Sequence, residues 1–278
     1  MDEMMKRKFG IYIFLGLLVG ALFGIFLGAG SANPILGIGG GALAGVFIGW
    51  LIAAAVMEKE KKKVDKPEMK TFKDYYLGII LRPSRTFNEL MNDNRRLKFG
   101  LLAFSISLIL YNFVYIFLSA GGGAPSSFNP WLAIPAEVYY HYDRFILAPS
   151  MFGCWILAAG VAHLLSKFFS GKGSFDDTLS GLGFAIGIAV LASLAHDLPD
   201  SFLGAIGVLN LKEYETILNS PTIWRTILWV LYISSAVLFI ILFPKAIGAA
   251  QKIKPAPAIF VGLVSFFVYQ FVFLIFNR

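Results

Sequence analysis

The chain has 278 residues, of which 57% are hydrophobic and 15% charged, and its mean hydropathy is +0.71. This composition excludes an ordinary soluble domain and predicts an all-α membrane protein that crosses the bilayer several times. The formal net charge of +7 falls mostly in short segments between apolar stretches, so we attribute it to membrane topology and expect no nucleic-acid partner. Cys154 is the one cysteine, which excludes a disulfide within the chain.

Seven apolar stretches are long enough to span a bilayer, which takes roughly 20 residues. They cover residues 9–30, 34–56, 99–120, 146–169, 178–196, 223–243 and 257–276. With the N-terminus in the cytoplasm, alternating spans place 20 of the 24 lysines and arginines inside. We therefore predict about seven helices with the N-terminus inside and the C-terminus outside. The apolar core of the first stretch is longer than that of a signal peptide, so we expect it to remain uncleaved.

The first two stretches carry glycine at every fourth position. Because a four-residue step keeps one helix face, bare glycines there let two helices approach closely in lipid. Residues 1–57 are thus predicted to form a glycine-zipper hairpin that packs against itself, against the bundle or against a second copy. The packing glycines are Gly16, Gly20, Gly24, Gly28, Gly37, Gly41, Gly45 and Gly49.

Residues 58–74 form a charged cytoplasmic linker, and residues 75–278 an interfacial helix followed by five spans. The interfacial helix is expected at residues 75–94, with Pro83 either in its first turn or breaking it. Basic residues in the linker, in the interfacial helix and directly after it are expected to contact the inner leaflet and its anionic lipids. They are Lys61, Lys62, Lys63, Arg82, Arg85, Arg95 and Arg96.

The sharpest candidate for chemistry lies in the two outer loops, residues 121–145 and 197–221. Carboxylate and imidazole groups there could converge on zinc, iron or manganese. The candidate ligands are Glu137, His141, His196, Asp197 and Asp200. The alternative is a set of polar residues at a wet interface, with His196 and Asp197 ending a helix.

Polar groups inside the spans are few. His163 and Asn112 are suited to bridging helices by hydrogen bonds, and the predicted spans bury no acidic or basic side chain that would indicate an ion pathway. Neither a Ser-His-Asp order nor a His-Glu-x-x-His motif occurs, and Lys172 is followed by Gly173, which excludes a phosphate-binding loop. We therefore expect no catalytic residue and no cofactor.

Three segments resemble the Yip family of Ypt-interacting membrane proteins. They are residues 82–90 (Arg-Pro-Ser-Arg-Thr-Phe-Asn-Glu-Leu), residues 169–179 with a Gly-Lys-Gly-Ser-Phe turn, and Trp224 followed by Lys245-Ala246. In the second segment, Ser174 and Asp177 are predicted to cap the next helix. The resemblance implies a five-helix domain with its N-terminus inside. Eukaryotic members are associated with trafficking and Rab GTPases, but this chain lacks their Asp-Leu-Tyr-Gly-Pro segment, so we do not expect Rab binding.

Three functions stay open. The leading hypothesis is a non-enzymatic, Yip-like membrane protein in the cell membrane of a prokaryote, which organises lipids or a partner protein or assembles with itself. The alternative is an oligomeric channel or transporter built from the glycine hairpins. A metal-dependent membrane enzyme using the outer His, Asp and Glu residues is the third.

Overall fold

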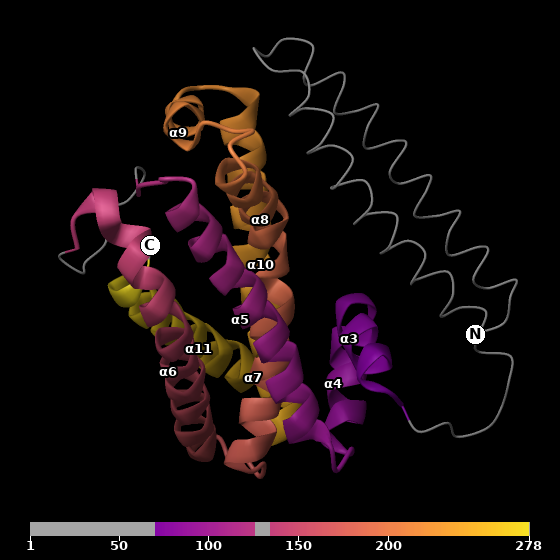
Figure 1. The fold of residues 1–278 in the computed structure, drawn as a ribbon. Coiled ribbons are helices and arrows are strands. Elements are labelled where there is room, and N and C mark those ends of the chain that lie inside the picture. Colours follow the sequence, from indigo (N-terminus) through magenta and orange to yellow (C-terminus); the bar gives the residue numbers. More distant parts are fainter. Residues whose placement is uncertain (1–69, 126–133, 278) are drawn as a thin grey trace, which may run out of the picture. The chain divides into compact units, whose positions relative to one another are not determined.

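A computed structural model of the protein describes residues 70–125 and 134–277, and all regular structure in these residues is helical (Figure 1). The predicted glycine hairpin, with its two glycine rows, and Lys61, Lys62 and Lys63 lie outside the described residues. The described elements are α3 (Phe72–Leu81), α4 (Pro83–Met91), α5 (Arg96–Ala120), the 3-10 turn η1 (Ala136–Val138), α6 (Tyr139–Phe168), α7 (Phe175–Ala189), α8 (Leu191–Ala205), α9 (Leu211–Asn219), α10 (Ile223–Gln251) and α11 (Pro255–Phe276).

Four of these helices, α5, α6, α10 and α11, are long and apolar enough to cross a membrane. The pair α7 and α8, bent by 48° at a short break, makes a fifth span if it is counted as one. The predicted all-α fold with several spans is therefore confirmed. Large apolar side chains point away from the bundle along the spans, among them Phe145, Leu164, Ile233 and Phe267, each more than half exposed. Such outward faces suit contact with lipid.

The helix ends differ from the prediction. Residues 197–205, expected as loop, continue α8, and α10 runs through Pro244 to Gln251 instead of ending near residue 243. Pro244 is accommodated because α11 has Gly262 opposite it, where a Cβ atom would lie 2.7 Å from the proline ring. A proline inside a helix removes one backbone hydrogen bond but does not have to end the helix.

The predicted interfacial helix is two helices, because Pro83 opens α4 at its first position. Thr71 caps α3 in a reciprocal pair with Asp74, so the helix begins within the predicted linker. Both helices are fixed to the bundle. Tyr76 of α3 donates to the Gly187 carbonyl oxygen at 3.1 Å, and Phe87 of α4 is completely buried.

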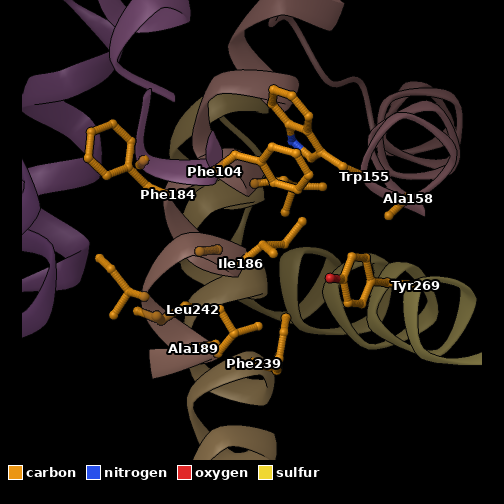
Figure 2. Close-up of a cluster of buried hydrophobic side chains, with 14 of the residues drawn as sticks. Phe104, Trp155, Ala158, Phe184, Ile186, Ala189, Phe239, Leu242 and Tyr269 are labelled. Atoms are coloured by element: carbon orange, nitrogen blue, oxygen red, sulfur yellow. The ribbon is translucent and has the colours of Figure 1, made fainter. Parts of the chain in front are cut away.

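The core lies around α7, whose residues from Gly181 to Ala189 are all buried. Phe104 of α5 stacks on Trp155 of α6 with ring centroids 4.4 Å apart, and both belong to the buried cluster drawn in Figure 2. Helices α5 and α7 come close enough that a Cβ atom on Gly183 would lie 2.4 Å from the Gly100 carbonyl oxygen. Small residues therefore set this helix contact, as is usual in membranes.

Candidate functional site

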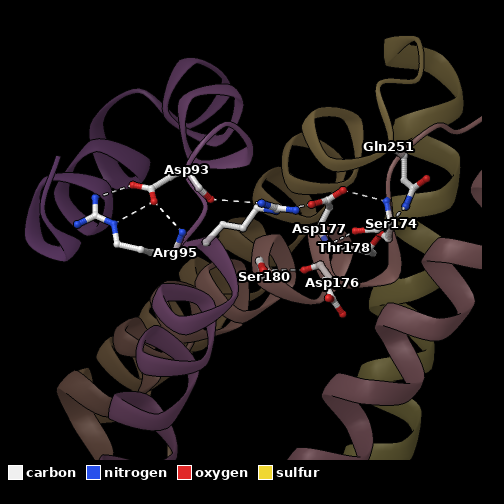
Figure 3. Close-up of polar contacts among 9 residues, drawn as sticks. Asp93, Arg95, Ser174, Asp176, Asp177, Thr178, Ser180 and Gln251 are labelled. Atoms are coloured by element: carbon white, nitrogen blue, oxygen red, sulfur yellow. Dashed lines mark hydrogen bonds and ion pairs between the residues drawn. The ribbon is translucent and has the colours of Figure 1, made fainter. Parts of the chain in front are cut away.

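One end of the bundle gathers the first turn of α7 and the ends of four other helices into a polar junction. Ser174 caps α7 by accepting from the Asp177 backbone N–H at 3.1 Å, while Asp177 accepts from the Ser174 N–H at 2.8 Å. The predicted capping pair is thus confirmed. Asp177 also forms an ion pair with Arg96 at the start of α5 (Figure 3). The cap of one span is therefore fastened to the beginning of another.

Beside this pair, Asp93 organises the corner between α4 and α5. Its carboxylate accepts from the Arg95 guanidinium at 2.8 Å (Figure 3). It also accepts from the Tyr75 hydroxyl at 3.1 Å. The hydrogen bond from Arg95 lowers the pKa of Asp93 to about 2. Burial, with the neighbouring Asp93 carboxylate, raises the pKa of Tyr75 to about 12. At neutral pH this corner therefore holds a fixed carboxylate and a neutral phenol.

The third part of the junction is Gln251, fully buried at the end of α10. Its Nε2 atom lies 2.6 Å from Thr178 Oγ1 of α7 and 3.0 Å from His163 Nδ1 of α6. The Lys172 backbone N–H donates to the Gln251 carbonyl oxygen at 2.9 Å, and Lys167 Nζ donates to the Gly173 carbonyl oxygen at 3.0 Å. His163, predicted as a helix bridge, lies in this network.

Three of the four described arginines that were expected to touch the inner leaflet are ion-paired within the protein. Arg85 pairs with Glu89 at 2.9 Å, Arg95 with Asp93 and Arg96 with Asp177. The fourth, Arg82, is half-buried at the break between α3 and α4. The guanidinium charges at this end are thus largely balanced by carboxylates.

The other end of the bundle holds His196, whose ring lies between two carboxylates. Its Nδ1 is 3.0 Å from Asp197 Oδ1 and its Nε2 is 3.0 Å from Asp200 Oδ2. Tyr214 of α9 donates to Asp200 at 2.9 Å, and Tyr232 of α10 donates to Asp197 at 3.0 Å. Because only an imidazolium has an N–H on both nitrogens, this geometry favours the charged ring. We refer to these five side chains as the His196 network.

The structure separates the predicted metal ligands into two groups. His196, Asp197 and Asp200 meet in the His196 network. Glu137 is exposed in η1, and exposed His141 lies 3.4 Å from the Arg144 guanidinium. Among residues 70–125 and 134–277, no group of three or more His, Cys, Asp or Glu side chains is arranged to hold a metal ion.

A cavity of about 540 Å³ adjoins the His196 network. Its wall comes mainly from α5, α8, α9, α10 and α11, and it contains both charged side chains, such as Asp200 and Arg225, and apolar ones, such as Phe239. The sequence did not reveal this cavity, because its wall combines helices that are distant along the chain. A volume of this size is typical of a small-molecule site.

Sequence reasoning also missed Asp143. The predicted span began at residue 146, but α6 begins at Tyr139 and buries Asp143 completely. Neither of its carboxylate oxygens has a hydrogen-bond partner within the described residues. The aromatic residues around it resembled an interfacial belt, and this hid the fact that the helix had already begun.

The fold and its two polar ends define an integral membrane protein with several apolar spans. The model of the Yip1 domain matches residues 77–276, which includes α4 to α11, the His196 network and all of the polar junction except Tyr75. The chain therefore belongs to the Yip1 domain family, as the resemblance implied. No curated protein and no solved structure gives a significant match to it.

Proposed function

We propose that this Yip-family membrane protein is non-enzymatic and organises a partner protein through the outer face of α4. The observation that carries the proposal is the two-sided character of this helix. Thr86, Phe87 and Leu90 are buried against the bundle, whereas Ser84, Arg85 and Asn88 are exposed. An amphipathic helix whose apolar face is already occupied offers only its polar face for binding.

The exposed face is held rigidly. Lys245 of α10 donates to Ser84 Oγ at 2.7 Å, and the α4–α5 corner is fixed by Asp93 and Arg95. A rigid surface loses little conformational entropy on binding, which favours a specific complex. The ion-paired arginines favour a protein partner over an anionic lipid, since their charge is already compensated.

The experiment compares complexes retained in native nanodiscs. The exchange Arg85→Glu with Glu89→Arg keeps an (i, i+4) ion pair but reverses its direction on the exposed face. The control, Lys212→Glu, changes charge on α9, near the His196 network. Native mass spectrometry should show one defined protein complex, either with a partner or with a second copy, for the wild type and for the control, and should show its loss in the exchange variant.

Two outcomes would refute this proposal: no bound protein in the wild type, or the same complex in the exchange variant. If the wild type retains an anionic lipid and the exchange variant loses it, the α4 face would bind the lipids of the inner leaflet and not a partner protein. A ring of several copies with solute flux in liposomes would favour the channel instead.

We further propose the cell membrane of a prokaryote as the location, supported by the missing Asp-Leu-Tyr-Gly-Pro segment.

A further inference from the structure

The cavity beside the His196 network is elongated. On α10 its wall includes Arg225 in the first turn and Phe239 near the middle of the helix. At about 1.5 Å of rise per residue, these two positions lie about 21 Å apart. One leaflet of a bilayer contributes about 15 Å of hydrocarbon, half of the core thickness. The cavity is therefore long enough for one acyl chain and the headgroup above it.

Its polarity changes along this length. Charged side chains line the end near the start of α10, namely Asp197, Asp200, Glu215, Arg225 and His196. The opposite end is lined by the rings of Phe239 and Tyr269, whose centroids are 5.4 Å apart, and by Met151. A ligand that fits this gradient is amphipathic, with a polar head and one apolar chain.

The cavity opens towards the side of the bundle. Trp229 and Tyr232 on α10 and Leu274 on α11 line it and are each at least 40% exposed. Helices α10 and α11 touch through Pro244 and Gly262, but the C-terminal end of α11 is held by α6, where Asn277 donates to Ser150 at 2.9 Å. The two helices diverge towards that end in Figure 1. Because Trp229, Tyr232 and Leu274 line the cavity and are exposed on these two helices, we take this side as the opening towards the lipid.

The charges at the polar end indicate the headgroup. Three carboxylates face two basic groups there, and both ring nitrogens of His196 are already directed at Asp197 and Asp200. A headgroup with a net negative charge would be repelled, because carboxylates outnumber the basic groups at this end. A zwitterionic head can place its ammonium near the carboxylates and its phosphate near the Arg225 guanidinium.

We propose that this cavity binds one zwitterionic, ammonium-bearing phospholipid, with one acyl chain between Arg225 and Phe239 and the headgroup beside the His196 network. The second chain then lies over the lateral opening, in the bilayer. The site is remote from the α4 face, because Lys245, which contacts α4, follows Tyr232 by more than three helical turns. The two proposals are tested with different variants, so each can fail alone.

The test uses the full chain in nanodiscs of equal parts phosphatidylethanolamine, phosphatidylcholine and phosphatidylglycerol. Ala236→Phe fills the cavity, because Ala236 lines it, whereas its neighbour Val237 is 46% exposed and makes Val237→Phe a matched control. Native mass spectrometry should find one ethanolamine or choline lipid per copy in the wild type and in the control. Occupancy in Ala236→Phe should fall about tenfold, or 1.4 kcal/mol.

Equal occupancy in the two variants would overturn the site, and selective retention of phosphatidylglycerol would overturn the headgroup assignment. A second measurement needs no variant. A phosphatidylethanolamine with a photoreactive group at the end of one chain should label Phe239 or Tyr269 in the wild-type protein. Labelling confined to outward side chains such as Val237 and Phe267 would contradict the proposal, even if Ala236→Phe did not fold.

Discussion

Gln251 Nε2 donates to Thr178 Oγ1 across 2.6 Å, and both side chains are buried. The same nitrogen lies 3.0 Å from His163 Nδ1 and 3.3 Å from the Ser174 carbonyl oxygen. One amide therefore connects α6, α7 and α10 at the polar junction. Because an apolar surrounding strengthens a hydrogen bond and makes its loss costly, this contact should stabilise the bundle.

Gln251→Leu should lower the free energy of unfolding by about 1–3 kcal/mol, because it leaves the Thr178 hydroxyl and the His163 ring without their amide partner. The measurement is thermal unfolding in detergent, followed by circular dichroism. Gln270→Leu on α11, which makes the same chemical change in a half-buried position, should have a smaller effect. Equal losses in the two variants would show that the junction contributes nothing of its own.

The contact between α5 and α7 depends on the absence of side chains at glycine. Gly183→Ala would place a methyl group 2.4 Å from the Gly100 carbonyl oxygen, so the helices would have to separate. We expect a loss of about 1–3 kcal/mol, typical of overpacking. Gly153→Ala is the control, since a Cβ atom at Gly153 has no neighbour within 4 Å, and it should leave stability unchanged or raise it.

Acid should weaken the corner that Asp93 organises. The folded-state pKa of Asp93, about 2, lies below its ordinary value of 3.8, so its stabilising contribution is complete above pH 4 and is lost as the pH falls through about 2. Asp93→Asn removes this contribution. The difference in unfolding free energy between wild type and Asp93→Asn should therefore be constant from pH 7 to 4 and shrink between pH 4 and 2. A constant difference down to pH 2 would contradict the assignment.

Hydropathy predicted the spans of this fold because lipid exposure is a property of local sequence. The capping pair Ser174 and Asp177 was predictable for the same reason, since its members are three residues apart. The ends of the helices were not predictable from local sequence. The polar residues that continue α8 past His196, for example, are stabilised by Tyr214 and Tyr232 from other helices. Gly183 and Gly187 are four residues apart, the spacing from which an N-terminal glycine hairpin was predicted, and this spacing could have indicated the α5–α7 contact.

In the candidate sites, too, the local features were predictable from the sequence and the contacts between distant helices were not. Topology predicted that His196, Asp197 and Asp200 lie on one side of the membrane, and their helix brings them together. Distances to Glu137 and His141 depend on how α6 packs, which no local pattern encodes. Gln251 and Thr178 are separated by 73 residues, so their contact also arises only from packing.

Asp143 is a buried polar group inside the helix bundle. Its carboxyl group is fully buried in α6, and neither oxygen has a hydrogen-bond partner within the described residues. Burying such a group costs free energy that an apolar side chain of similar size would not cost. Asp143→Leu should therefore stabilise the protein by about 1–3 kcal/mol. Asp176→Leu, at the exposed start of α7, makes the same side-chain replacement without removing a buried polar group and should bring no gain. If Asp143→Leu destabilised the fold, the carboxyl group would have to make a stabilising interaction, and its role would be structural.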